Sequence, residues 1–233
     1  MPVSSLDAPT LKIVGPTSTG PCNLAVAYAD ANPTCDDVLV ALTQIRQTGS
    51  RHVVTQAMTS EQARPFMQAG AYRRLELAVL ELGDVHGASC DNAWRPRHLR
   101  PSMPWELKVA EQIDIDAFGD PDSFDRRALR DACLVTPRHR LVIARRDRTP
   151  VGFAICGAAQ QRSMLQRLAV SPHYQRHGVG ADLVRHCIHW ASRQGAATMV
   201  VNTGIDNHQA LGLYERHGFV RTTQSLCVLG FTL

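Results

Sequence analysis

Lysine is almost missing from this chain of 233 residues, which holds only Lys12 and Lys108. Arginine supplies the rest of the positive charge, the net charge is +4, and no dense basic run occurs. Proteins that bind nucleic acid usually carry a clustered basic face, and a transmembrane helix needs about eighteen or more consecutive apolar residues. The sequence has neither feature. It therefore predicts neither nucleic acid nor a membrane as a partner.

Cysteine pairs are also lacking, because the seven cysteines are odd in number and include no Cys-x-x-Cys motif. This usage favours a reducing compartment over a disulfide framework. The opening residues, MPVSSLDAPTLK, lack the basic and then apolar regions of a signal peptide. We therefore expect a soluble, cytoplasmic protein. A cluster of His173, His177, His186, Cys187 and His189 matches no zinc spacing, so we expect no metal site.

What the chain does have, from residue 105 onward, is an alternation of helical and strand patterns. Apolar residues at 180, 183, 184, 187, 188 and 191 follow the period of a half-buried helix. A second helix is expected after a capping box of Asp206 and Gln209. Further helices are expected over 105–119 and 122–136, and strands over 140–146, 151–159, 163–170, 198–202, 219–223 and 225–233. This order predicts an α/β protein with a mixed sheet.

The apolar helix begins behind two glycines in the segment QRHGVG, residues 175–180. A helix start offers unpaired N–H groups and a partial positive charge, so it attracts anions such as phosphate. On these six residues alone a tight turn is the simpler interpretation. A Walker A loop would need Gly-Lys-Ser/Thr, and a Rossmann loop would need a third glycine and an acidic ribose ligand. Neither is present at this place.

Two longer segments carry a resemblance to a known family. The segments LQRLAVSPHYQRHGVGADLV (165–184) and NTGIDNHQALGLYERHGF (202–219) resemble the two signature motifs of the GCN5-related N-acetyltransferase (GNAT) family. The first contains the family's Q/R-x-x-G-x-G/A loop at 175–180. The second matches N-x-x-A-x-x-x-Y-x-x-x-G-F through Asn207, Ala210, Tyr214, Gly218 and Phe219. The resemblance covers about residues 95–233 and implies the GNAT fold with acetyl-CoA as the co-substrate.

The resemblance also implies site residues. The backbone of the glycine loop would bind the pyrophosphate, with Arg176 adding charge, and the preceding strand would pair with the pantetheine. Asn207 would hold the next helix start against the cofactor, or would simply be its first residue. The implied cofactor-binding residues are Leu168, Ala169, Val170, Gln175, Arg176, His177, Gly178, Val179, Gly180 and Asn207.

Tyr214 resembles the family's general acid. A phenol with a pKa near 10 is protonated at neutral pH and can donate its proton to a departing thiolate. The sequence departs from the family at the general base, because Gln166 and Asn202 occupy the usual carboxylate positions. Four other carboxylates could stand in for the base, but we interpret them as surface helix charges: Glu106, Asp114, Asp116 and Glu215. A water chain that ends on backbone carbonyls is a further alternative. The base is left unassigned.

The front of the chain repeats this outline weakly. Residues 39–83 follow the order of 183–230, with Gly49 parallel to Gly195 and Gly70 parallel to Gly218, at offsets of 146 to 148. Met67 would stand at the position of Tyr214, and no glycine loop is present. We expect a degenerate GNAT-like half over 1–88, a linker over 83–97, and a catalytic GNAT domain over 89–233.

The sequence thus predicts an N-acetyltransferase that moves an acetyl group from acetyl-CoA directly to a primary amine, on a protein N-terminus or a small molecule. A non-catalytic acyl-CoA-binding regulator is the alternative, because the usual carboxylates are missing. The acceptor, the acyl-chain preference and the oligomeric state stay open, since acceptor contacts lie on variable loops.

Overall fold

The computed structural model describes residues 6–8, 11–14, 24–29, 33–47, 49–88, 99–101, 106–119 and 122–233. These residues form two compact units. One comprises Met1–Ala78 together with Thr223–Leu233, and the other comprises Val79–Thr222. The units therefore meet along the chain at 78/79 and 222/223, whereas the expected domain boundary lies at 88/89. The chain crosses between the units twice, since its last residues belong to the first unit.

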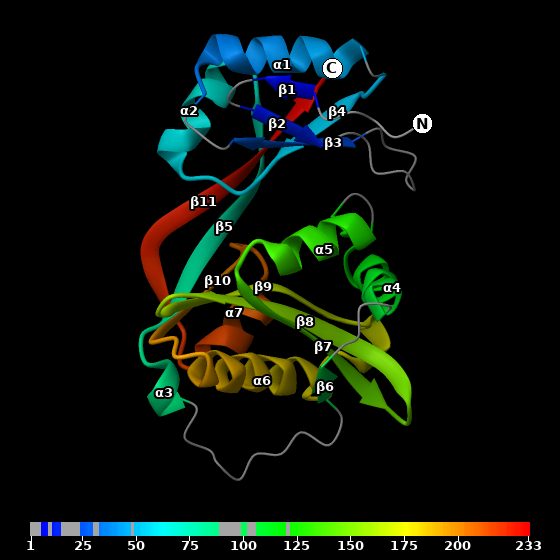
Figure 1. Ribbon diagram of the computed structural model, residues 1–233, viewed down its shortest axis with the longest axis vertical. Helices are drawn as coiled ribbons and strands as arrows, with labels where there is room; N and C mark the ends of the chain where they lie inside the picture. Colours follow the sequence, from blue (N-terminus) through cyan, green and yellow to red (C-terminus); the bar gives the residue numbers. More distant parts are fainter. Residues whose placement is uncertain are drawn as a thin grey trace. The chain divides into compact units, whose positions relative to one another are not determined.

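The unit of residues 79–222 contains a mixed sheet flanked by helices on both faces. Its strand order is β11-β5-β10-β9-β8-β7-β6. The strands β6 (Leu99–Pro101), β7 (Arg138–Arg146), β8 (Thr149–Ala159) and β9 (Arg162–Val170) pair antiparallel, whereas β9 and β10 (Thr198–Gly204) are parallel. Figure 1 shows α4 (Leu107–Phe118) and α5 (Arg126–Leu134) on one face and α6 (Val179–Arg193) on the other. The predicted mixed α/β sheet is confirmed.

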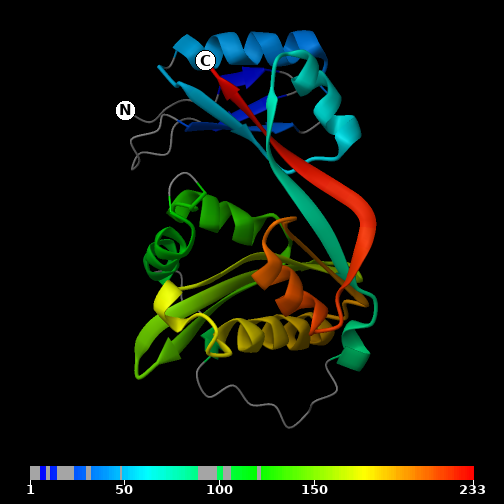
Figure 2. The ribbon, with the colours of Figure 1, turned by 180° about the vertical axis from the view of Figure 1, so that it is seen from behind.

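Apolar residues at helical and strand spacing build the core beneath α4 and α5. Ile113 and Leu129 from the helices pack with Phe153 and Ile155 of β8, and all four are at most 3% exposed. On the other face, α6 buries the apolar positions that its sequence predicted, among them Leu183, Cys187 and Ala191. The helix α7 (His208–Glu215) contacts α6, as Figure 2 shows from behind.

The other unit places its strands in the order β1-β2-β3-β4-β11-β5. Here β3 (Leu24–Ala29) and β4 (His52–Thr55) run parallel and are joined through α1 (Cys35–Gln47). The strands β1 (Leu6–Ala8) and β2 (Leu11–Val14) add antiparallel pairs at the edge. Then follow α2 (Ser60–Gln68) and β5 (Tyr72–Leu82). A core of buried residues from α1, α2, β4 and the end of β11 holds this unit together.

The strands β5 and β11 (Val220–Thr232) have residues in both units. Residues 79–82 of β5 belong to the unit of residues 79–222, where β5 lies between β10 and β11. Conversely, Gly230 and Phe231 of β11 pair antiparallel with Val54 and Val53 of β4. Two separate final strands were expected over 219–223 and 225–233, and this was wrong, because one strand runs continuously through both.

The start of the expected linker is folded. The short helix α3 (Val85–Ala88) lies within it, and the Val85 side chain is fully buried. The Val85 N–H donates to the Ala197 carbonyl at 3.0 Å, which ties α3 to the sheet end of its own unit. The rest of the expected linker, residues 89–97, lies outside the described residues. No helix in the described part of the chain has the length and apolar character to cross a membrane.

Candidate functional site

The free edge of β9 forms one wall of the candidate site. Pairing with β8 extends along the strand to Val170, but pairing with β10 ends at Leu165. Within the described chain, residues 166–170 therefore have no strand partner on the β10 side. The predicted pantetheine-binding residues Leu168, Ala169 and Val170 all lie in this stretch. An extended ligand can add to such an edge as an extra strand.

A β-bulge at Gln166 marks the point where β9 leaves β10. Ile155 of β8 faces Arg167, whereas the next residue, Cys156, faces Leu165, so Gln166 has no partner in the register. A bulge bends its strand and interrupts regular pairing. The Oε1 atom of Gln166 is buried and has no hydrogen-bond partner among the described residues.

The glycine loop and the start of α6 form the second wall. Arg176 and Gly178 both have positive φ, at 63° and 82°. Gly178 is the N-cap of α6, no side chain caps the helix, and the first helical bond runs from the Asp182 N–H to the Gly178 carbonyl at 3.0 Å. The N–H groups of Val179 and Gly180 precede that bond, so they have no partner within the helix. The predicted loop is thus a backbone cradle suited to a phosphate anion.

Glycine is favoured at the two positions of the cradle for different reasons. A Cβ on Gly178 would meet no heavy atom within 4 Å, so only its positive φ favours glycine. A Cβ on Gly180 would lie 3.2 Å from Leu213 Cδ2. Gly180 therefore allows α6 to start close to α7, which brings the cradle next to the helix of Tyr214.

Side chains around the cradle fix its shape. Gln175 Nε2 donates to the Val170 carbonyl at 3.1 Å, and this links the loop to the end of β9. The ring Nδ1 of His177 lies 2.7 Å from the Gln175 carbonyl. Arg146 of β7 donates to the His177 carbonyl at 3.4 Å, and it brings a second cation beside Arg176. Sequence reasoning missed Arg146, because nothing in its local pattern connects it with a loop thirty residues later.

Tyr214 lies on the buried side of α7 and is 5% exposed. Its ring centre is 5.8 Å from that of Phe219. Burial raises the pKa of the Tyr214 phenol well above its ordinary value, and nearby Cys187 raises that pKa further, whereas Arg167 partly lowers it. The phenol is therefore protonated at neutral pH, which is the state that a general acid requires.

Asn207 is the N-cap of α7, and its side-chain Oδ1 accepts the Ala210 N–H at 3.0 Å. The expected capping box of Asp206 and Gln209 is wrong by one residue, because both Asp and Asn are good cap residues and the local pattern does not choose between them. Because Asn207 Oδ1 accepts the capping hydrogen bond, a contact between Asn207 and the cofactor would involve other atoms of this residue.

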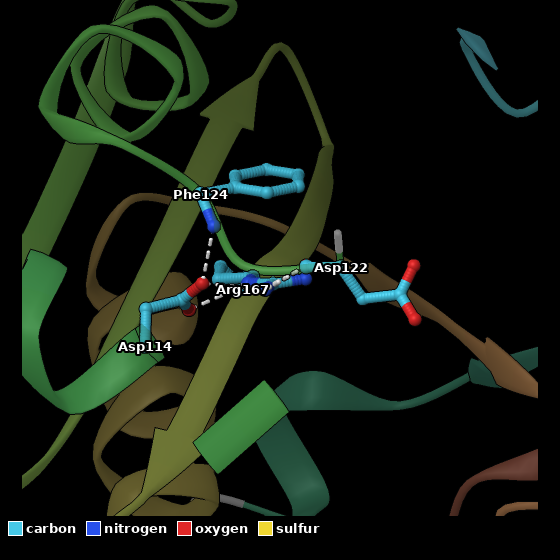
Figure 3. Close-up of polar contacts among 4 residues, drawn as sticks. All are labelled: Asp114, Asp122, Phe124 and Arg167. Atoms are coloured by element: carbon cyan, nitrogen blue, oxygen red, sulfur yellow. Dashed lines mark hydrogen bonds and ion pairs between the residues drawn. The ribbon is translucent and has the colours of Figure 1, made fainter. Parts of the chain in front are cut away.

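Two of the carboxylates interpreted as surface charges are buried instead. Asp114 is fully buried and forms a two-point ion pair with Arg167 of β9 (Figure 3). Glu106 is 4% exposed and bonds Arg145 at 2.5 Å. The surface interpretation was wrong for both, because their partners lie 53 and 39 residues away in sequence. Neither is a free base, since each carboxylate is engaged by an arginine side chain.

The other two carboxylates are exposed, as expected: Asp116 accepts from Gln112 at 2.9 Å, and Glu215 lies 3.3 Å from Arg221. Gln166 and Asn202 lie on β9 and β10, and neither side chain can take up a proton. Among the described residues, no three metal-ligating side chains gather into a cluster.

Comparisons with known proteins agree with this geometry. A model of the Acetyltransferase (GNAT) family matches residues 106–219. The ribosomal protein bS18-alanine N-acetyltransferase of Escherichia coli K12 is 37% identical over 71 residues, which cover 30% of this chain and 48% of that protein. Human N-alpha-acetyltransferase 30 is 37% identical over 76 residues, covering 30% of this chain and 21% of that protein. The chain thus spans about half or less of the curated relatives that it matches.

A solved structure extends the likeness in fold to the front of the chain. The tandem GNAT protein from the clavulanic acid biosynthesis pathway aligns with a TM-score of 0.66 at 11% identity, and it covers 95% of this chain and 78% of that one. At this identity the likeness concerns the fold alone. The free edge of β9, the backbone cradle at α6, the buried Tyr214 and the matching family model lead to one conclusion: residues 106–219 form a GNAT-family acetyltransferase domain.

Proposed function

We propose that this protein is an acetyl-CoA-dependent N-acetyltransferase that transfers the acetyl group directly to a primary amine. The observation that carries the proposal is the joint presence of an unpaired β9 edge and an uncapped α6 start. The first suits an extended amide chain and the second suits a pyrophosphate, and coenzyme A contains both. The residues present therefore fit the co-substrate.

In this proposal the peptide groups of Leu168 to Val170 hold the pantetheine arm, and the N–H groups of Val179 and Gly180 hold the pyrophosphate. Arg146 and Arg176 add positive charge beside the phosphates. This arrangement fixes the thioester near the bulge at Gln166 and within reach of Tyr214. The amine nitrogen forms the new C–N bond as the C–S bond breaks, Tyr214 protonates the departing sulfur, and the amine loses a proton.

The acceptor amine enters the reaction neutral, because its lone pair makes the new bond. No described carboxylate at the site is free to take its proton, so we propose that the solvent does. The relatives named above act on protein N-termini, by their names. We propose the N-terminus of a polypeptide as the first acceptor class to test, and a small-molecule amine as the second.

A non-catalytic acyl-CoA-binding regulator is a second candidate. It is favoured by one observation: the positions of the usual carboxylates hold Gln166 and Asn202, and the buried Asp114 and Glu106 are both bound to arginines. Such a protein would bind the cofactor and would release no thiol with any amine.

Thiol release from acetyl-CoA, followed with a panel of peptides, polyamines and aminoglycosides, separates the two candidates. An enzyme gives acceptor-dependent release of coenzyme A together with an acetylated product found by mass spectrometry. Binding of acetyl-CoA with no release across the panel supports the regulator. No binding of acetyl-CoA at all would contradict both.

A further inference from the structure

The side chain of Arg167 is held from several directions. It extends from the part of β9 that has no strand partner on the β10 side, directly before the predicted pantetheine-binding residues. Its Nε and Nη2 atoms donate to Asp114 Oδ1 and Oδ2 at 2.8 and 2.6 Å. Nη2 also donates to the Asp122 carbonyl at 2.9 Å (Figure 3). A two-point pair of this kind fixes the direction of the guanidinium as well as its distance.

Two aromatic rings complete the enclosure. The ring centres of Phe118 and Phe124 lie 3.9 and 4.0 Å from Arg167 Cζ. The guanidinium carbon thus lies over both aromatic rings. Phe118 belongs to α4, and Phe124 lies in the segment between α4 and α5. Arg167 therefore contacts both α4 and the connection between α4 and α5.

The backbone of that connection is fixed by the same group. The Phe124 N–H donates to Asp114 Oδ2 at 2.6 Å, and the Asp122 carbonyl accepts from Arg167. The fully buried Asp114 thus accepts three hydrogen bonds, two from Arg167 and one from this connection. Without Arg167, a buried carboxylate would lose its counter-charge and the connection would lose two of its anchors.

We propose that Arg167 is a positioning residue that fixes Asp122–Phe124 and the end of α4 against β9 and so shapes the acceptor side of the site. The inference rests on the proposed function, because the acceptor amine must enter beside the thioester that β9 holds. The charge of Arg167 is balanced by Asp114, so the group orders the wall of the site and adds no net charge to it.

A second buried pair offers a matched control. Arg145 and Glu106 join β7 to the N-terminal end of α4 at 2.5 Å, with side chains 23% and 5% exposed. The pair of Arg167 and Asp114 is similar, at 2.6 Å with side chains 15% and 0% exposed. Breaking either pair leaves a buried carboxylate without its counter-charge, so both changes cost stability. Only the Arg167 pair holds the connection between α4 and α5.

The test compares Arg167→Met, Arg145→Met and the double variant Arg167→Met with Asp114→Asn in the full chain. For each variant, kinetics give the KM of the amine, calorimetry gives the dissociation constant of acetyl-CoA, and amide hydrogen exchange follows residues 122–126. We expect Arg167→Met to raise the amine KM about tenfold or more, since small displacements of a positioned reactant are costly. Acetyl-CoA affinity should change less than about twofold, a shift of under roughly 0.4 kcal/mol.

The double variant removes both buried charges, so its stability should recover relative to Arg167→Met. Its amine KM should stay high, and exchange at residues 122–126 should stay fast. The proposal is overturned if the amine KM of the double variant returns to the wild-type value when its stability recovers. It is also overturned if Arg145→Met raises the amine KM as much as Arg167→Met does. If no amine is acetylated, the proposed function is wrong. The hydrogen-exchange data alone then test whether Arg167 positions residues 122–126. Equal exchange in Arg167→Met and in the wild-type protein would contradict that role.

Discussion

Phe66 and Tyr214 occupy the same place in their respective helices, 148 residues apart (214 − 66). The Ala71 N–H donates to the Phe66 carbonyl at 3.0 Å, and the Phe219 N–H donates to the Tyr214 carbonyl at 3.2 Å. Each of these hydrogen bonds spans a turn that contains a glycine of positive φ, Gly70 at 94° and Gly218 at 84°. Both aromatic residues are buried, at 1% and 5% exposed.

This relationship corrects the sequence comparison, which placed Met67 at the position of Tyr214. Met67 is 41% exposed, and the matching offset is 148 rather than 147. The helix caps agree with 148: Thr59 and Asn207 each accept the N–H of the third residue into their helix. We therefore propose that the front unit is a degenerate copy of the catalytic one, with a phenyl ring in place of the phenol.

We predict one acetyl-CoA site per chain. The segment between β3 and α1, residues 30–34, contains no glycine, so the sequence of the front unit lacks a counterpart of Gly178 there. Titration calorimetry of the full chain should give a stoichiometry of one. Two equivalent sites would contradict the degenerate copy.

Gly178→Val should weaken acetyl-CoA binding by about tenfold or more, because a β-branched residue is strongly disfavoured at the positive φ of this N-cap. Gly178→Asn is the matched control, since asparagine tolerates that backbone region and also caps helices well. Its affinity should stay within a few-fold of the wild type. Calorimetry measures both, and equal affinities for valine and asparagine would show that the φ of Gly178 does not matter for the cradle.

Tyr214→Phe should reduce turnover by about 10²–10⁴, the usual contribution of a general acid. Acetyl-CoA affinity should change little, because the ring remains. Phe66→Tyr, which restores the phenol in the front unit, should add no activity. A Tyr214→Phe variant with wild-type turnover would make Tyr214 a packing residue only.

The pH profile of the wild-type enzyme follows from the same groups. With no protein base, kcat/KM for a peptide amine should rise with pH until the amine is neutral, near pH 8. The raised pKa of Tyr214 keeps the acid protonated, so the rate should not fall again below about pH 10. A rising limb near pH 6 instead, the same for every amine, would reveal a protein base.

Acid should destabilise the protein partly through His186. Burial, together with the charges of Arg140 and His189, lowers the pKa of His186 to about 4. Between pH 6.5 and 4 the unfolded chain therefore binds a proton that the folded chain does not, so stability falls as the pH falls. The loss is on the order of 2 kcal/mol at most for this partly exposed ring. Thermal melts of His186→Gln should show a flatter pH dependence than the wild-type protein, with the exposed His139→Gln as the control variant.

A fragment of residues 89–233 should fail to fold alone. It lacks residues 79–82 of β5, which include the fully buried Leu80 and lie between β10 and β11. We expect the fragment to be insoluble, and co-expression with residues 1–88 to return it to solution. A soluble, monomeric and active fragment in a sizing column would contradict this.

Features of the fold and of the candidate site could be predicted from the sequence where residues close together in the chain determine them. The apolar spacing that predicted α6 and β9 and the glycine spacing that predicted the loop at Gly178 each extend over only a few residues. The structure has these elements where the sequence indicated. The burial of Asp114 could not be predicted, because a carboxylate at a helical position is usually solvated and its partner Arg167 lies on a strand 53 residues later. The course of β11 was missed for the same reason, since strand pairing is non-local and leaves no local signal.

The pairing of β4 with the end of β11 has a consequence for how the chain reaches its native state. The strand β4 of the front unit is synthesised early relative to its partner, because residues 230–232 of β11, with which it pairs, follow it at a long separation in sequence. Contacts that join such distant segments form slowly, because a long loop must close before they stabilise anything. During synthesis, β4 therefore stays without this partner until β11 has been produced. Deleting residues 230–232 would damage the unit that contains β4, although that unit's other strands precede them by far in sequence.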